Sequence, residues 1–185
     1  MRKLPKKTCF FICPLSQAGT EIRKRSDDLM KHILEPVTKE LGYEILRADL
    51  AFDEKISESI HKQIFDSAIV IADLSDHNPN VYYELGKRHA WKGACIHLIN
   101  DLKNIPFDLK DYRVFEYDLK DLDKNVELKK NIYNNIKQIE HTPPQPPYPL
   151  SNEDVISLSG ATVLVSRVSG RRDHYYQAKD LTKKI

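Results

Sequence analysis

The sequence predicts an α/β fold in which a mostly parallel sheet is covered by helices on both sides. Two observations lead to this prediction. Short apolar segments alternate along the chain with longer segments of helical periodicity. The segments between the predicted strands are also long enough to be helices, which indicates β–α–β units and therefore parallel strands. The 185 residues, 41% hydrophobic and 30% charged, are enough for one core and an additional segment.

The first half of the sheet is predicted from three segments. Thr8–Pro14 is an unbroken apolar run, typical of a strand buried on both faces. Glu21–Leu41 follows with helical spacing of its apolar residues, and we expect Pro36 to kink this helix or to end its first part. Gly42 is suited to the position just after the helix, and Tyr43–Ala48 is predicted to be the second strand.

The next β–α unit is predicted with the clearest patterns. Asp53–Asp66 is expected to be a helix because three isoleucines lie four residues apart. Ala68–Leu74 has the composition of a buried strand. A third helix is expected over Asn78–Lys92, with Asn78 as its N-cap and Pro79 as its first residue.

Two strands and one helix complete the predicted domain: Ala94–Asn100, Tyr112–Tyr117 and the amphipathic segment Leu122–Ile139. Five strands in this order suit a flavodoxin-like, doubly wound sheet of order 2-1-3-4-5. In such sheets a ligand lies beyond the carboxyl ends of the strands, at the switch point between strands one and three. The residues that follow Pro14 and Leu74 are therefore the candidates for a site.

The C-terminal segment is predicted to be separate from this domain. We expect a domain at residues 1–140, a proline-rich linker at 141–150, and a hairpin with a basic tail at 151–185. His141–Pro149 holds five prolines in nine residues and is predicted to be an extended spacer. Val155–Ser159 and Thr162–Ser166 alternate apolar and polar residues around Gly160-Ala161, which predicts a two-residue hairpin turn.

Charge and hydropathy exclude several functional classes. The longest apolar runs have five residues, so no membrane span or signal segment is expected, and we expect a cytoplasmic protein. Residues 1–140 hold 23 basic and 23 acidic residues, and such a balance argues against binding to a nucleic-acid duplex. The histidines and cysteines form no HExxH or CxxC pair, so neither a metal site nor a cofactor is predicted.

The loop after the first predicted strand is a candidate phosphate site. Ser16, Gly19 and Thr20 lie there, just before a helix N-terminus that offers unpaired N–H groups and a positive dipole end. Arg23 and its two basic neighbours follow. The alternative is that Thr20 only caps the helix and that the basic side chains form a solvated face.

The segment after the third predicted strand carries the main candidate residues. With 100° per residue, Glu84 lies about 60° from the sheet-facing Val81, on a half-buried flank beside the cleft. A carboxylate there could accept a ribose hydroxyl or attack an anomeric carbon. The alternative is a helical ion pair with Lys87 or Arg88. Asp73 and Asn78 are further candidate catalytic residues, and the candidate binding residues in and near this cleft are Asp76, His77, Asn80 and Asn100.

Three segments in this order carry a family resemblance: CFFICPLSQAGTEIRKRSDD, ADLSDHNPNVYYELGKRHA and IPFDLKDYRVFEY. They resemble the nucleoside 2-deoxyribosyltransferase-like superfamily over about residues 8–117. The closest resemblance is to its bacterial branch with NPNVxYELG segments, which is often described as Toll/interleukin-receptor-like.

The resemblance implies a flavodoxin-like fold and cleavage or exchange of N-glycosidic bonds. It also implies that Glu84, in the ELG segment, is the nucleophile. The carboxylate that the family has six residues earlier is replaced here by Asn78, which cannot take a proton but can hold a nucleobase edge. The strand-one tyrosine of the transferases falls near Phe10, which has no hydroxyl.

These observations favour an enzyme in which Glu84 attacks a (deoxy)nucleotide or NAD while the Ser16–Thr20 loop holds phosphate and Asp73 or Asp76 positions the sugar or base. A module that binds a nucleotide signal without turnover is the second hypothesis, and a homo-oligomer is expected. The third is a nucleic-acid or assembly role for the tail, whose candidate residues are Arg167, Arg171, Arg172, Tyr175, Tyr176 and Lys179. We favour a solvated tail over this third role. His89 and His97 are expected to be satisfied core residues.

Overall fold

The computed structural model describes residues 7–50, 56–90, 93–142, 155–158 and 161–164. The chain divides into two compact units, Met1–Pro144 and Gln145–Ile185. The division falls inside the predicted proline-rich segment. The tail residues from 165 onward, and with them the third functional hypothesis, lie outside the described residues.

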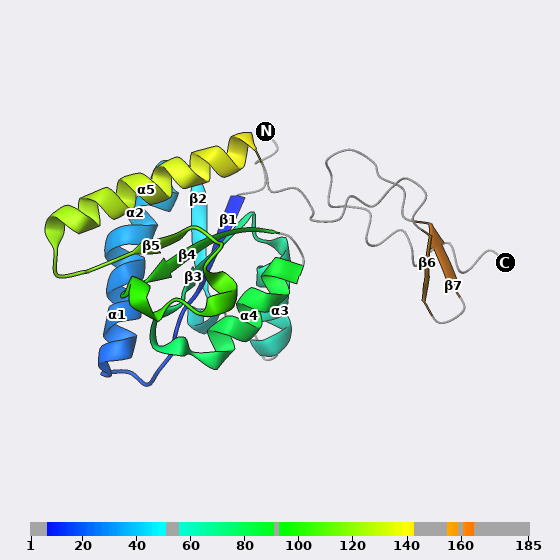
Figure 1. Ribbon diagram of the computed structural model, residues 1–185, viewed down its shortest axis with the longest axis horizontal. Helices are drawn as coiled ribbons and strands as arrows, with labels where there is room; N and C mark the ends of the chain where they lie inside the picture. The colour runs from blue at the N-terminus through cyan, green and yellow to red at the C-terminus, as the bar shows by residue number, and fades with distance from the viewer. Residues whose placement is uncertain (1–6, 51–55, 91–92, 143–154, 159–160, 165–185) are drawn as a thin grey trace. The chain divides into compact units, whose positions relative to one another are not determined.

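A five-stranded parallel sheet of order β2-β1-β3-β4-β5 forms the centre of the first unit, which confirms the predicted flavodoxin-like α/β fold (Figure 1). Each strand lies within the segment predicted for it or begins one residue earlier. The strands are β1 Lys7–Ile12, β2 Tyr43–Arg47, β3 Ile69–Asp73, β4 Ala94–Ile99 and β5 Val114–Glu116. Every residue of the central β3 is buried, as a strand covered on both faces requires.

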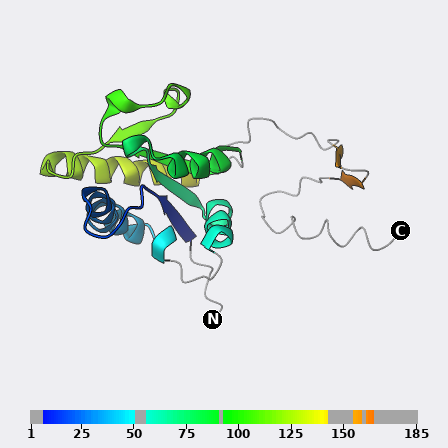
Figure 2. The same ribbon diagram turned by 90° about the horizontal axis from the view of Figure 1, so that it is seen from below.

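Helices cover both faces of this sheet (Figures 1 and 2). They are α1 Glu21–Leu29, α2 Glu35–Glu40, α3 Ile56–Asp66, α4 Pro79–Ala90 and α5 Leu122–His141. Side chains of α1, α2 and α5 share one apolar core with one face of the sheet. Side chains of α3 and α4 share the second core with the other face. Helix α5 reaches His141, which the sequence placed in the linker.

Pro36 interrupts the first helical segment as predicted. Helix α1 ends at Leu29, a π-helical turn spans Met30–Leu34, and α2 follows. Because proline has no N–H and its ring crowds the preceding turn, the chain changes its hydrogen-bond pattern just before it. Gly42 ends the segment with a φ of 77°, in the left-handed region that favours glycine.

The second unit contains an antiparallel hairpin of β6 Val155–Leu158 and β7 Ala161–Leu164. Ala161, expected in the turn, instead belongs to β7 and pairs with Leu158.

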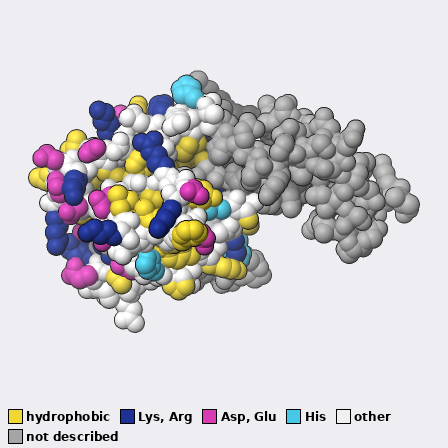
Figure 3. All heavy atoms as spheres, in the orientation of Figure 1, with side chains coloured by type: hydrophobic (Ala, Val, Ile, Leu, Met, Phe, Trp, Pro, Cys, Tyr) yellow, Lys and Arg dark blue, Asp and Glu magenta, His cyan; other side chains and the backbone are white. Residues whose placement is uncertain are grey.

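The surface of the described residues carries interspersed acidic and basic side chains on the face shown in Figure 3. This distribution agrees with the neutral charge of residues 1–140. Among the described helices, none combines the length and the apolar content needed to cross a membrane.

Candidate functional site

A hollow of about 290 Å³ opens beyond the carboxyl ends of β1 and β3. These strands are parallel neighbours, with Ile12 opposite Ala72, so the segments that follow them meet at one edge of the sheet. This is the switch point at which the doubly wound topology places a ligand. The lining residues are Phe11, Ile12, Cys13, Leu15, Ala48, Ile60, Asn78, Asn80, Tyr83 and Glu84.

Glu84 is the one acidic residue among those lining side chains. It is half-buried in α4, and no hydrogen bond or ion pair joins its carboxylate to any described residue. Burial raises its pKa from 4.5 to about 7, against an opposing effect of the Lys87 charge. An unpaired carboxylate in a mostly apolar hollow is poorly solvated, and a ligand with hydroxyls or positive charge would relieve this cost.

The two cations expected as alternative partners of Glu84 are bound elsewhere. Lys87 contacts the His61 ring nitrogen and lies 3.9 Å from the centroid of the Tyr83 ring. Arg88 is buried and donates to backbone carbonyls before and after β3, among them those of Ile64 at 2.7 Å and Ala94 at 3.1 Å. Arg88 therefore ties α4 to the end of α3 and the start of β4, and neither cation forms an ion pair with Glu84.

Asn78 and Asn80 join Glu84 in the hollow. The Asn78 side-chain oxygen accepts from the N–H of Asn80 at 3.0 Å and from that of Val81 at 3.4 Å, which confirms its predicted role as a helix cap. That oxygen is thus occupied, and the amide NH₂ of Asn78 has no partner among the described residues. Asn80 is exposed.

Asp73 does not line this hollow, because its side chain is fully buried at the end of β3. Its carboxylate accepts from the Ser75 hydroxyl at 2.6 Å and from the Tyr117 hydroxyl at 3.0 Å. Burial raises its pKa, although these hydrogen bonds oppose the shift. The Ser75 hydroxyl also accepts from the backbone N–H of Asn100 at 3.0 Å. Asp73 therefore joins the ends of β3, β4 and β5 and has no contact with the hollow.

Asp76 and His77 lie between β3 and α4 in a strained turn. Both have positive φ values, 62° and 49°, which non-glycine residues rarely adopt. Asp76 forms an ion pair with Arg25, and the His77 ring nitrogen lies 2.7 Å from the Asn104 carbonyl oxygen. These contacts hold the turn against α1 and against the segment around Asn104, and neither side chain lines the Glu84 hollow.

His77 instead lines a larger, open hollow of about 390 Å³. Its other lining residues are Tyr82, Lys103, Asn104, Ile105 and Pro106. No carboxylate is among them. The smaller hollow is therefore the better candidate for carboxylate chemistry, and Asn100 belongs to neither.

The predicted phosphate-binding residues of the loop after β1 do not line the Glu84 hollow. The Thr20 hydroxyl accepts from the Arg23 N–H at 3.2 Å and donates to the Gln17 carbonyl at 2.9 Å, so it caps α1. Ser16 is half-buried and Gly19 is exposed, with a φ of 88°. The capping alternative is confirmed for Thr20.

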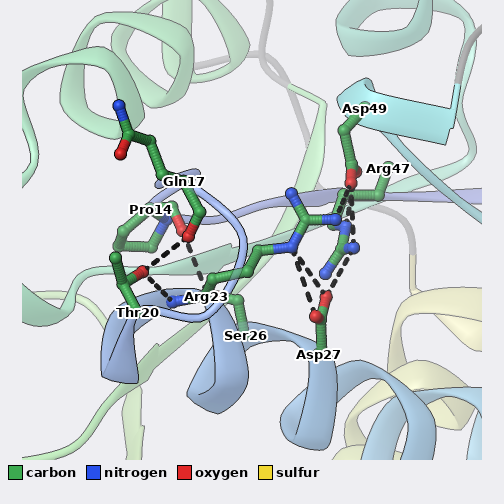
Figure 4. A network of polar contacts seen from close by, with 8 residues as sticks. All are labelled: Pro14, Gln17, Thr20, Arg23, Ser26, Asp27, Arg47 and Asp49. Atoms are coloured by element: carbon green, nitrogen blue, oxygen red, sulfur yellow. Dashed lines mark hydrogen bonds and ion pairs between the residues drawn. The ribbon is translucent and has the colours of Figure 1, made fainter.

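Arg23 belongs to a network that the sequence did not predict (Figure 4). It pairs with Asp27 and Asp49, and the buried Arg47 pairs with the same two carboxylates, at 2.7 and 2.6 Å. Partial burial raises the pKa of Asp27, but the hydrogen bonds from Arg47 and Arg23 outweigh it and lower that pKa. The basic residues after Thr20 are thus paired and do not form a free solvated face.

Several lining residues of the hollow were not predicted. Ala48 follows β2, and Ile60 lies on α3, so only the assembled fold brings them near Glu84. Tyr83 precedes Glu84 directly and was not singled out. Phe11, one residue after the position matched to the family tyrosine, lines the hollow, whereas Phe10 is buried in the α3–α4 core.

Comparison with protein-family models and with curated proteins finds no match for this chain.

Proposed function

We propose that this protein cleaves or exchanges the N-glycosidic bond of a nucleoside or nucleotide, with the Glu84 carboxylate as the nucleophile. The single observation that carries the proposal is a half-buried carboxylate, without a partner among the described residues, inside a hollow at the switch point of the sheet. Structural carboxylates elsewhere in this fold, such as Asp73 and Asp49, have several partners. A carboxylate that lacks them is a candidate for contact with a substrate.

The size and lining of the hollow support a nucleoside-sized substrate. About 290 Å³ is near the lower limit for small-molecule sites, roughly 300 Å³, and suits one nucleoside better than a whole dinucleotide. The apolar side chains of Ile12, Leu15 and Ile60 offer a surface for a planar base. The free amide NH₂ of Asn78 offers a hydrogen bond to an acceptor on the base edge.

The proposed reaction follows from the Glu84 carboxylate. One of its oxygens forms a bond to the anomeric carbon as the bond from that carbon to the base nitrogen breaks, and the electron pair leaves with the base. Water or a second base then displaces Glu84 and restores the carboxylate. Since the ionised form is the nucleophile, a pKa of about 7 makes the rate rise with pH through neutrality.

The lining also favours one class of leaving group. No described lining residue besides Glu84 is a carboxylic acid or a histidine, so no second carboxylic acid and no imidazole lies there to protonate the departing base. A base that leaves as a neutral molecule from a cationic nucleoside, as nicotinamide leaves its riboside, needs no proton. The positive charge of such a substrate would also stabilise ionised Glu84.

A nucleotide sensor without turnover is the second candidate. The observation in its favour is Asn78, which stands where the resembled family has a carboxylate. Its side-chain oxygen caps α4 by accepting two backbone hydrogen bonds. The same hollow then binds the ligand, but proton transfer by this residue is absent.

Base release from NAD, nucleosides and deoxynucleotides tests the proposal. We expect wild type to release base from one of them, and Glu84→Gln to lower the rate by about 10³-fold or more. Glu40→Gln, at an exposed position of α2, is the matched control. Ligand binding in calorimetry without release would favour the sensor instead. Equal release by wild type and Glu84→Gln would overturn the role of Glu84.

A further inference from the structure

A cluster of two histidines and a cysteine lies away from the Glu84 hollow. His89 is in the last turn of α4, while Cys95 and His97 are on β4. Cys95 and His97 lie two residues apart, so their side chains leave the same face of the strand, the face that α4 covers. The potential ligand atoms of all three lie within 4.8 Å of one another.

The two imidazoles face each other through equivalent nitrogens. Nε2 of His89 is 2.9 Å from Nε2 of His97, so only one of them can carry a hydrogen and the other presents its lone pair. Burial lowers the pKa of His89, and burial with the nearby His89 lowers that of His97 to about 4.

We propose that His89, Cys95 and His97 bind one divalent transition-metal ion of the zinc class. One thiolate and two imidazoles are ligands that zinc prefers, and three protein ligands leave a fourth tetrahedral position for water. Coordination breaks the S–H bond of Cys95, and its proton passes to solvent. The site does not involve Glu84 and is independent of the proposed glycosidic reaction.

The arrangement needs only small movements to reach zinc geometry. Two nitrogens bound to zinc at about 2.05 Å lie about 3.3 Å apart at the tetrahedral angle, and nitrogen and sulfur about 3.6 Å apart. The histidine nitrogens must separate slightly from 2.9 Å, and Cys95 must approach by at most about 1.2 Å from within 4.8 Å. Rotation of the Cys95 and His89 side chains, both half-buried, can supply this.

The surroundings of His97 and His89 resemble the outer shell of a metal site. His97 makes a backbone hydrogen bond with Arg113, which is how ligating histidines fix the orientation of the ring. Tyr112 stacks on His89 with ring centroids 4.6 Å apart and lies 5.2 Å from the His97 ring. The hydrogen bond thus orients the His97 ring, and Tyr112 packs against both rings.

Titration of the full chain with zinc chloride in metal-free buffer, followed by calorimetry, is the first test. We expect one tightly bound ion per chain, and cobalt chloride should give a thiolate-to-cobalt absorption band. Cys95→Ser should abolish that band, and His89→Gln should weaken zinc binding at least tenfold. His32→Gln, at an exposed position, is the control and should bind as wild type does.

Thiol alkylation of wild type decides the outcome if a variant does not fold. Zinc should slow the labelling of Cys95 at least tenfold. The labelling rates of Cys9 and Cys13 should be the same with and without zinc. Zinc binding with no cobalt–thiolate band and no protection of Cys95 would overturn the proposed site, as would the absence of zinc binding.

Discussion

Charged side chains lie at the same edge of the sheet in two regions, one around α1 and the end of β2 and the other on α4. The two regions differ in whether these charges form ion pairs. In the first region Arg23 and Arg47 share Asp27 and Asp49, and each cation contacts both carboxylates. In the second, Glu84 lies among apolar residues and asparagines with no ion pair to any described residue. Charges of the first region stabilise each other, whereas the charge of the second costs free energy until a ligand binds.

Residue spacing along the chain suggests that the basic residues after Thr20 are free and that Glu84 is paired, and the structure shows the reverse among the described residues. The basic residues after Thr20 were candidates for free phosphate ligands, and Glu84 lies four residues before an arginine. In the fold, Arg47 at the end of β2 and Arg23 both form ion pairs with Asp49, which follows β2. Arg88 binds backbone carbonyls and not Glu84. Pairing at this edge is therefore decided by tertiary contacts.

Arg47→Met should produce the largest loss of stability among these changes. It leaves Asp27 and Asp49 with Arg23 alone and removes an arginine that is only 5% exposed. Loss of one partner from a buried pair costs about 3–5 kcal/mol, and the partial exposure of the carboxylates reduces our expectation to about 2–3 kcal/mol. Urea unfolding followed by circular dichroism measures the difference.

Lys62→Met, at an exposed position of α3, is the control for Arg47→Met and should change the free energy of unfolding by less than about 0.5 kcal/mol. If Arg47→Met matched this control, the network would contribute no more than surface ion pairs, and the contrast with Glu84 would fail.

Glu84→Gln should have the opposite effect on stability, and only above a certain pH. Because the pKa of Glu84 rises from 4.5 to about 7 on folding, the folded state holds more protons than the unfolded state between these values. Wild-type stability then falls as pH rises through this window. The shift corresponds to about 3 kcal/mol, which solvent screening reduces to about 1–2 kcal/mol. Glutamine avoids this loss.

Urea unfolding at pH 5 and pH 8 measures this effect. The gain of Glu84→Gln over wild type should grow by about 1–2 kcal/mol between the two pH values, whereas Glu40→Gln should follow wild type throughout. A gain that is the same at both pH values would mean that Glu84 is well solvated.

The strand order and most element positions could be predicted from the sequence because they depend on local pattern. Apolar runs locate β1 and β3, Asn78 and Pro79 mark the start of α4, and Pro36 marks the interruption of the first helical segment. Two of the segments that line the Glu84 hollow could be predicted, because the residues after β1 and after β3 meet wherever these strands are parallel neighbours. Ala48 and Ile60 came from distant segments and carried no signal.

The partners of charged and metal-ligating residues could not be predicted in this way. Asp73 is a polar residue at a strand end, and the sequence could not show that Tyr117, from beyond β5, would bury it. The His89, Cys95 and His97 cluster combines helix and strand spacing, so no single-period motif describes it. Such sites become visible only when α4 lies over β4.

Thr20→Ala should have the smallest effect and sharpens the comparison at the β1 loop. Loss of the cap to the Arg23 N–H should lower the free energy of unfolding by about 1 kcal/mol, and Thr20→Ser should restore it. The ratio of nucleotide to nucleoside turnover should stay unchanged, because the Thr20 hydroxyl is used within the loop and lies outside the hollow. A selective loss of nucleotide turnover in Thr20→Ala would instead show that this helix N-terminus holds phosphate, and the β1 loop would then belong to the same site as Glu84.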